Sequence, residues 1–211
     1  MMEQLMTAPV ASFIFVVTII TTLMAFSNDE VYGNLILHPY SVYRGQRVYT
    51  VITSGLIHSD WMHLFFNMLS YYFFAFDLER VLGHWQFGLL YILSLILSDL
   101  PTVYKHKNDD RYHCLGASGA VSAVIFSSIL FNPVGLMMIM PIPFPIYSIV
   151  FGILYLVYCN YASKYGQDNV NHDAHLFGAL SGLLITIVLY PHIVNSFFIQ
   201  ISEKVQSLLH G

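Results

Sequence analysis

The chain has 211 residues, of which 56% are hydrophobic and only 9% are charged. A soluble domain carries about a quarter of charged residues, so this composition excludes a protein covered by a water-facing surface and predicts one integral membrane domain across residues 1–211. The net charge of −4 comes without a basic cluster, which excludes nucleic acid as a partner.

Six apolar segments predict six membrane-spanning helices, because backbone in lipid must satisfy its own hydrogen bonds and these segments lack the alternation typical of strands. The first segment is long enough to span the membrane. A secretion signal would have Lys or Arg before its apolar part, and none precedes this segment. The fourth is short: about 14 residues cover about 21 Å of a ~30 Å core, so we expect its neighbours to shield it. In chain order the segments are 8–26, 61–78, 85–98, 118–131, 145–161 and 174–189.

Three connecting segments complete the predicted all-α, polytopic fold, whose six-helix core covers about residues 8–190. Residues 27–57 have no clean period but contain apolar and tyrosine side chains, which favours a partly embedded first loop. Prolines at 141, 143 and 145 make residues 137–146 a stiff connector without regular helix. The tail, 191–211, has helical apolar spacing and is expected to form an amphipathic helix on the membrane surface.

Polar side chains at the starts of three predicted spans are expensive in a bilayer and call for an explanation. If six spans alternate in direction, the starts of the second, fourth and sixth lie on one membrane face, so these side chains converge at one depth. They are His58, His63 and Asn67, then Ser118, then His172, Asp173 and His175.

Ser118 lies between Gly116 and Gly119, and Gly119 with Ala123 forms a small-residue face that lets another helix approach closely. A serine in this setting can be a packing residue bonded to a carbonyl one turn back. It can also be a nucleophile, if a base lies within reach.

His175 supplies a candidate base, because Gly178 and Gly182 follow it at i+3 and i+7 on the same helical stripe. These glycines would let the sixth helix press against the small face of the fourth and bring the imidazole near the Ser118 hydroxyl. The alternative is a histidine bonded to a backbone carbonyl.

His63 and Asn67 are four residues apart and share a helical face, where both can donate to a developing oxyanion. The backbone N–H of Ser118 at a helix N-terminus is a further donor. Asn67 could instead hydrogen-bond between spans. His58 lies about 140° around the helix from His63 and is expected to fasten the preceding loop.

A zinc site is an alternative use of the histidines at positions 58, 63, 172 and 175. However, the chain has no HExxH motif, and His58 and His63 diverge on their helix. The two cysteines, Cys114 and Cys159, lie far apart without metal-ligand spacing and are expected to be free thiols. We therefore expect no metal and no cofactor.

These motifs resemble the rhomboid family of intramembrane serine proteases. The spacing of His58, His63 and Asn67 resembles its His-x4-His-x3-Asn pattern, residues 116–119 its GxSG, and residues 174–182 its last-span AHxxG with a further glycine. The resemblance implies that Ser118 attacks the scissile carbonyl, that His175 is general base and then acid, and that His63, Asn67 and the Ser118 amide hold the oxyanion. It implies no third carboxylate, so Asp173 need not orient His175.

The resemblance further implies substrates that are single-pass membrane proteins cut near the membrane face, with the fifth span and residues 162–171 as lateral gate and lid. Two positions depart from the family pattern. An aromatic–arginine pair of the first loop is replaced by Tyr49 and Thr50, unless Arg47 takes over the anchoring. A tyrosine that stacks on the catalytic histidine is replaced by Ser122, so another group must orient His175.

The resemblance implies a bacterial-type cell membrane with the site facing outside, whereas the charge count favours the opposite orientation. Six cations lie on the predicted active face, at positions 44, 47, 105, 107, 111 and 164, and two lie opposite, at 80 and 204. Two other functions remain open: a non-catalytic relative that binds transmembrane segments, and a small transporter, against which the lack of a repeated half argues. The oligomeric state stays undetermined.

Overall fold

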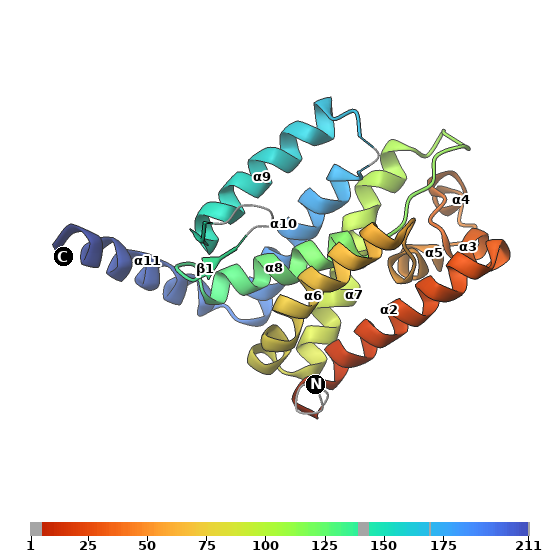
Figure 1. The fold of residues 1–211 in the computed structure, drawn as a ribbon. Coiled ribbons are helices and arrows are strands. Elements are labelled where there is room, and N and C mark those ends of the chain that lie inside the picture. Colours follow the sequence, from red (N-terminus) through yellow and green to blue (C-terminus); the bar gives the residue numbers. More distant parts are fainter. Residues whose placement is uncertain (1–5, 139–143, 169, 211) are drawn as a thin grey trace.

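The computed structural model describes residues 6–138, 144–168 and 170–210, and most of them are helical (Figure 1). Each of the six predicted apolar segments forms a helix. The elements are α2 (Pro9–Ser27), α3 (Asp29–Leu35), α4 (Pro39–Tyr43), α5 (Thr50–Thr53), η1 (Ser54–Leu56), α6 (Trp61–Leu82), α7 (His84–Lys105), α8 (Ser118–Phe131), β1 (Leu136–Met137), β2 (Ile146–Tyr147), α9 (Ser148–Tyr165), α10 (His172–Leu189) and α11 (Ile193–His210).

Three of the helices, α2, α7 and α10, are long and apolar enough to cross a membrane. Helix α8 is apolar but has only 14 residues, as the sequence predicts. Helices α6 and α9 have 22 and 18 residues, and their polar side chains keep them outside that set. The apolar helices mark the chain as an integral membrane protein, with α8 enclosed by its neighbours.

Helix α7 is longer than predicted, because it continues through Pro101 to Lys105 rather than ending at Ser98. Residues at the start of α10 hold its last turn in place. Thr102 exchanges hydrogen bonds with Asn171 at 3.0 and 3.1 Å, and Lys105 pairs with Asp173 at 2.6 Å. These contacts with the start of α10 stabilise a turn that the apolar pattern alone does not predict.

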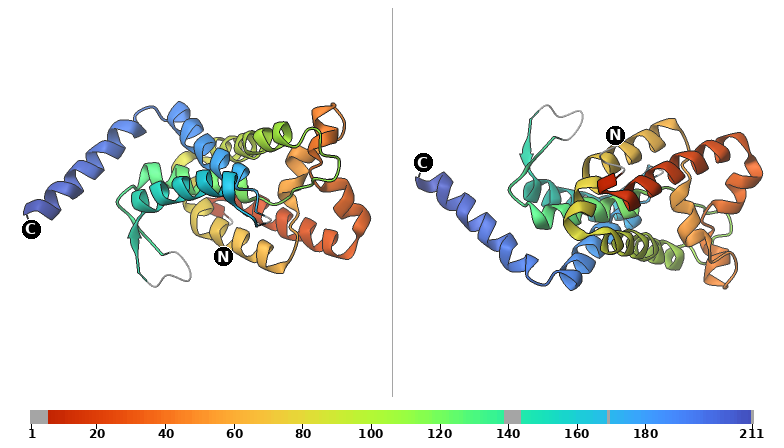
Figure 2. Two further views of the ribbon diagram at one scale, coloured as in Figure 1. Left: turned by 90° about the horizontal axis from the view of Figure 1, so that it is seen from above. Right: turned by 90° about the horizontal axis from the view of Figure 1, so that it is seen from below.

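The predicted first loop folds into the short helices α3, α4, α5 and η1, which lie together at one end of the bundle in both views of Figure 2. Arg47 has a left-handed φ of 52°, and its side chain donates hydrogen bonds to the carbonyls of Gly33 and Ile36. These bonds join two parts of the first loop to each other. Leu37 pairs with Cys114 through two backbone hydrogen bonds of 3.0 and 3.1 Å. The loop is thereby tied to the chain that leads into α8.

The predicted stiff connector begins and ends in a two-stranded antiparallel hairpin, with Leu136 opposite Tyr147 and Met137 opposite Ile146. The sequence did not predict these strands, and Pro141 and Pro143 lie outside the described residues. The tail forms the predicted helix, α11, which extends away from the bundle (Figures 1 and 2). Ile193 is its only residue that is buried within the part of the tail that is described.

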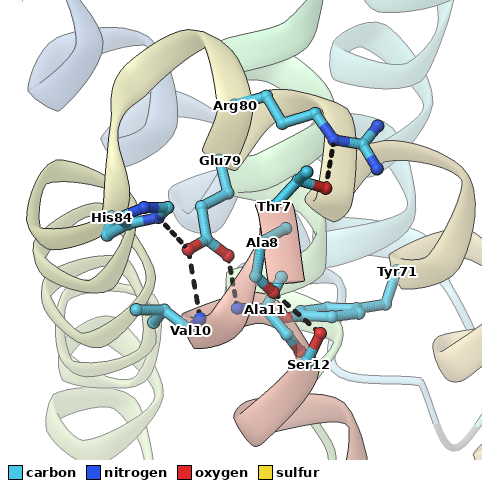
Figure 3. A network of polar contacts seen from close by, with 9 residues as sticks. All are labelled: Thr7, Ala8, Val10, Ala11, Ser12, Tyr71, Glu79, Arg80 and His84. Atoms are coloured by element: carbon cyan, nitrogen blue, oxygen red, sulfur yellow. Dashed lines mark hydrogen bonds and ion pairs between the residues drawn. The ribbon is translucent and has the colours of Figure 1, made fainter. Parts of the chain in front are cut away.

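A buried carboxylate holds three helices together at the bundle end where α6 passes into α7 (Figure 3). Helix α2 begins without a side-chain cap of its own. Glu79 of α6, fully buried, accepts hydrogen bonds from the free N–H groups of Val10 at 3.1 Å and Ala11 at 2.6 Å. It also bonds to His84 Nδ1 at 2.7 Å. The carboxylate therefore caps α2 from a distance, where the helix dipole favours negative charge.

Replacing Glu79 with Gln should lower the free energy of unfolding by about 1–3 kcal/mol, because the amide NH2 cannot accept the hydrogen bond that the lost oxygen accepted. The measurement is reversible unfolding in mixed detergent micelles. Glu203→Gln, the same exchange at an exposed position of α11, is the control and should leave stability unchanged. Equal stabilities of the two variants would contradict the role of this cap.

Candidate active site

The packing of α8 on α10 positions the candidate site. A Cβ added at Gly178 would lie 2.1 Å from the carbonyl oxygen of Gly119, and one added at Gly182 would lie 2.3 Å from that of Ala123. One turn further on, the Thr186 hydroxyl donates to Ser127 Oγ at 2.6 Å. Partners thus advance by four residues on both helices, so α8 and α10 run parallel with their backbones in contact, as the glycine spacing predicts.

The parallel register brings the starts of α8 and α10 together. Ser118 is the first residue of α8, directly before Gly119, and His175 lies one turn before Gly178. The carbonyl oxygen of Ala174 lies 3.3 Å from the Cβ position of Gly119. Both side chains are half-buried. No hydrogen bond joins the Ser118 hydroxyl to His175 among the described residues. Such bonds are often long in a free enzyme and tighten when substrate binds.

The start of α10 is fixed to the end of α7. The Asn171 side chain accepts from the Ala174 N–H at 3.1 Å and so caps α10, while it also bonds to Thr102. Asp173 pairs with Lys105 and accepts from the Ser163 hydroxyl. The Asp173 carboxylate is therefore engaged by Lys105 and Ser163.

The start of α6 approaches the chain just before Ser118. Asp60 caps α6 by accepting from the His63 N–H at 2.9 Å, and this hydrogen bond lowers the pKa of the exposed Asp60 carboxyl. The His63 ring packs on Gly116, where an added Cβ would lie 2.8 Å from Nε2. Gly116 also has a φ of 113°, which only glycine adopts readily. Its N–H donates to the Ser54 carbonyl at 2.9 Å.

Asn67 of α6 and His58, which lies in the connection before α6, take different positions. Asn67 is buried, and one of its amide hydrogens is donated to the carbonyl of His63 at 3.0 Å. His58 is fully buried, and its Nδ1 bonds to Thr22 Oγ1 at 3.1 Å. The Thr22 hydroxyl donates to the Leu56 carbonyl, so His58 joins α2 to the end of the first loop. The rings of His58 and His63 meet edge to face at 4.9 Å.

Tyr155 of α9 stacks on His175, with ring centroids 6.4 Å apart and planes at 20°. Its hydroxyl is hydrogen-bonded to Ser122 Oγ at 2.7 Å. Ser122 is the position where the family pattern would have the stacking tyrosine. In this chain the ring comes from a different helix, and the small residue at 122 holds its hydroxyl.

One group of side chains in the described part of the chain could hold a metal ion. It consists of Cys159, His172 and His175, with one ligand atom from each within 4.8 Å of the others. The zinc site that the sequence left as an alternative combined His172 and His175 with His58 and His63. The structure instead brings them to Cys159, one of the two cysteines that are free as predicted.

Comparison with known proteins identifies the fold. The Rhomboid domain matches residues 45–192, which include every predicted site residue. The chain belongs to the rhomboid family. It is 31% identical over 146 residues to the protein named "Putative rhomboid protease YdcA" of Bacillus subtilis, an alignment that covers 65% of each chain. It is 26% identical over 158 residues to the rhomboid protease AarA of Providencia stuartii, covering 66% of this chain and 56% of the relative.

A further relative is the mitochondrial RHOMBOID-like protein 12 of Arabidopsis thaliana, 26% identical over 155 residues, with 65% of this chain and 45% of the relative covered. The chain thus spans less than two thirds of the length of each of these three relatives. Tyr155 and Cys159 were not predicted, because no motif in the sequence links either of them to His175.

A cavity of about 450 Å³ lies at the opposite end of α8 from Ser118. Phe73 and Asp77 of α6, Ser128 of α8 and Leu136 of the hairpin are among its lining residues. None of the predicted site residues faces it, so the candidate active site does not depend on this cavity.

Gly178→Ala should reduce the free energy of unfolding by about 1–3 kcal/mol, since the new methyl group would overlap backbone atoms of Gly119 that cannot move aside. Unfolding in mixed micelles measures the change. Gly88→Ala in α7 is the matched control, because its Cβ would make an ordinary 3.5 Å contact with Val10. If both variants retained the stability of the parent chain, the close contact of α8 and α10 would not govern the fold.

Proposed function

We propose that this rhomboid chain is an intramembrane serine endopeptidase in which Ser118 is the nucleophile and His175 the general base. One observation carries the proposal: glycine-mediated packing holds the first turns of two parallel helices together, and each turn contributes one of these side chains. In this proposal α6, α8 and α9 also cross the membrane, giving six spans. The relatives named as rhomboid proteases support the reaction class.

The reaction begins when Ser118 Oγ attacks the scissile carbonyl carbon while its proton passes to His175. The carbonyl π electrons move onto the oxygen, which becomes an oxyanion. Collapse of this intermediate breaks the C–N bond, and the leaving amine takes the proton from His175. His175 then deprotonates a water molecule that attacks the acyl ester. Collapse of the second intermediate breaks the bond between the acyl carbon and Ser118 Oγ, and His175 returns its proton to Oγ.

The oxyanion would be held by donors from two helices. The backbone N–H of Ser118 belongs to the first turn of α8, where it has no partner within the helix. Asn67 keeps a second amide hydrogen after its bond to the His63 carbonyl. The Ser59 hydroxyl donates to Asp60, so His63 Nδ1, 3.1 Å from Ser59 Oγ, carries the ring proton, and Nε2 donates to the oxyanion when the ring is doubly protonated. Donors of this kind stabilise charge that appears only in the transition state.

His175 needs a fixed ring plane to serve Ser118 and then the leaving group. We assign this task to Tyr155, whose ring covers the imidazole and whose hydroxyl is held by Ser122. Because Tyr155 belongs to α9 and His175 to α10, the relative position of these two helices would determine whether the base is oriented for catalysis.

The proposed substrates are single-pass membrane proteins, cut close to the membrane face where the starts of α6, α8 and α10 lie.

The proposed location is a bacterial-type cell membrane with this face outside. Several cations on this face are engaged within the protein, which weakens the charge count against that orientation. Lys105 pairs with Asp173, and Arg44 and Arg47 donate to backbone carbonyls.

Ser118→Ala should reduce cleavage of a model transmembrane substrate in liposomes by about 10³-fold or more, since no other group supplies the attacking oxygen. Gel analysis of the product over time measures the rate. Ser128→Ala is the matched control: Ser128 lies at the far end of α8, and its hydroxyl bonds to the Val124 carbonyl. Cleavage that persists in the Ser118 variant would refute the proposed function.

Tyr155→Ala should lower kcat by about 10- to 100-fold with little change in KM, because a misplaced base slows the chemical step more than binding. Tyr155→Phe keeps the ring and loses the hydroxyl that bonds to Ser122, so its kcat should fall a few-fold. Tyr165→Ala, at the exposed end of α9, serves as control. A kcat for Tyr155→Ala equal to that of the control would assign the orientation of His175 to another group.

A further inference from the structure

Three potential ligands, one from α9 and two from the first turn of α10, lie together. Cys159 is fully buried, His172 is 5% exposed and His175 is half-buried. One ligand atom from each lies within 4.8 Å of the other two. The histidines are three positions apart, so one turn of α10 presents both imidazoles to the thiol of α9.

His172 has an unusual hydrogen-bonding state for a buried side chain. Its Nε2 lies 2.9 and 3.2 Å from the two carboxylate oxygens of Asp168. An ionised carboxylate only accepts, so Nε2 carries the proton and the neutral ring has its lone pair at Nδ1. That Nδ1 is buried and has no hydrogen-bond partner among the described residues. A buried acceptor without a donor is costly, and a bound cation would remove that cost.

The carboxylate on the far nitrogen is the arrangement that orients histidines bound to metals. The tautomer and the ring plane of His172 are thus already set, and Asp168 would contribute a compensating negative charge.

The ligand chemistry selects a class of ion. One thiolate and two imidazoles suit a borderline-soft divalent cation such as Zn²⁺, and they exclude Ca²⁺ and Mg²⁺, which require oxygen ligands. Tetrahedral zinc with these ligands places the donor atoms about 3.3–3.6 Å apart. The three ligand atoms, which lie within 4.8 Å of one another, therefore reach these separations with small side-chain adjustments. Three protein ligands leave a fourth position for water.

We infer that Cys159, His172 and His175 form a site for Zn²⁺ and that occupation of this site inhibits cleavage. The inhibitory part rests on the proposed function, whereas the binding part does not. Zinc replaces the thiol proton of Cys159, which leaves to solvent. Cys159 and His172 have no part in the proposed reaction, so the site draws the base into a complex with two groups that the reaction does not use.

Inhibition follows whichever nitrogen of His175 binds the metal. A neutral imidazole has one lone pair and one N–H. Once zinc occupies the lone pair, the other nitrogen carries the proton, and the ring can no longer take the proton of Ser118. The metal therefore removes the base without displacing a side chain from the bundle.

The binding test uses the metal-stripped full chain in detergent, titrated with Zn²⁺ by calorimetry and with Co²⁺ by absorption spectroscopy. The expected results are one Zn²⁺ per chain and a thiolate-to-cobalt charge-transfer band. Cys159→Ser should abolish the band and weaken Zn²⁺ binding by at least about 10-fold, and Asp168→Asn should weaken binding by about 10- to 100-fold. Cys114→Ser, the control at the other free cysteine, should match the parent chain.

The activity test measures cleavage with and without Zn²⁺. The parent chain should lose activity with added Zn²⁺ and regain it with a chelator, while Cys159→Ser should stay active at the same concentration. Equal Zn²⁺ affinity of the parent chain and Cys159→Ser would overturn the site. Tight binding without loss of cleavage would overturn the inhibitory role. If the metal-free parent chain showed no Ser118-dependent cleavage, the proposed function would fail while the calorimetric and cobalt results still decided the site.

Discussion

The arrangement of the whole bundle depends on a contact between two backbones. Between helices in lipid the hydrophobic effect contributes little, so close van der Waals packing has to hold them together. Gly178 and Gly182 make that packing possible by leaving no side-chain atoms between α10 and α8. Because α8 and α10 run parallel and α9 connects them in the chain, α9 has to run back across the bundle in the opposite direction. The return places Tyr155 and Cys159 beside His175, so the surroundings of the imidazole follow from the same contact.

Features of the sequence that act locally could be predicted well. The bounds of α8 follow from Ser118 at its start and the Asn132–Pro133 pair after its end, and the structure has the same bounds. The glycine stripe of α10 predicts its contact face, since only a neighbouring backbone fits against glycines four residues apart. Counting spans predicts that the starts of α6, α8 and α10 share one end of the bundle, and the contacts of His63 with Gly116 and of Ala174 with Gly119 agree.

Features that depend on a distant partner could not be predicted. The apolar pattern of α9 does not indicate which of its faces meets α10, so neither the stacking of Tyr155 nor the placement of Cys159 follows from it. The last turn of α7 contains Pro101 and polar residues, and it is stable because Thr102 and Lys105 find partners at the start of α10. The hairpin of β1 and β2 consists of two residues per strand, too few to leave a periodic signal.

The cap of Glu79 on α2 also has a consequence for biosynthesis. The carboxylate lies 68 residues after the Ala11 N–H that it accepts, so the ribosome makes α2 well before its cap exists. Until α6 arrives, the amides of Val10 and Ala11 must be hydrated or bound by lipid headgroups, which keeps that end of α2 at the membrane surface. Arrival of Glu79 then replaces those partners and commits the α2–α6 pair.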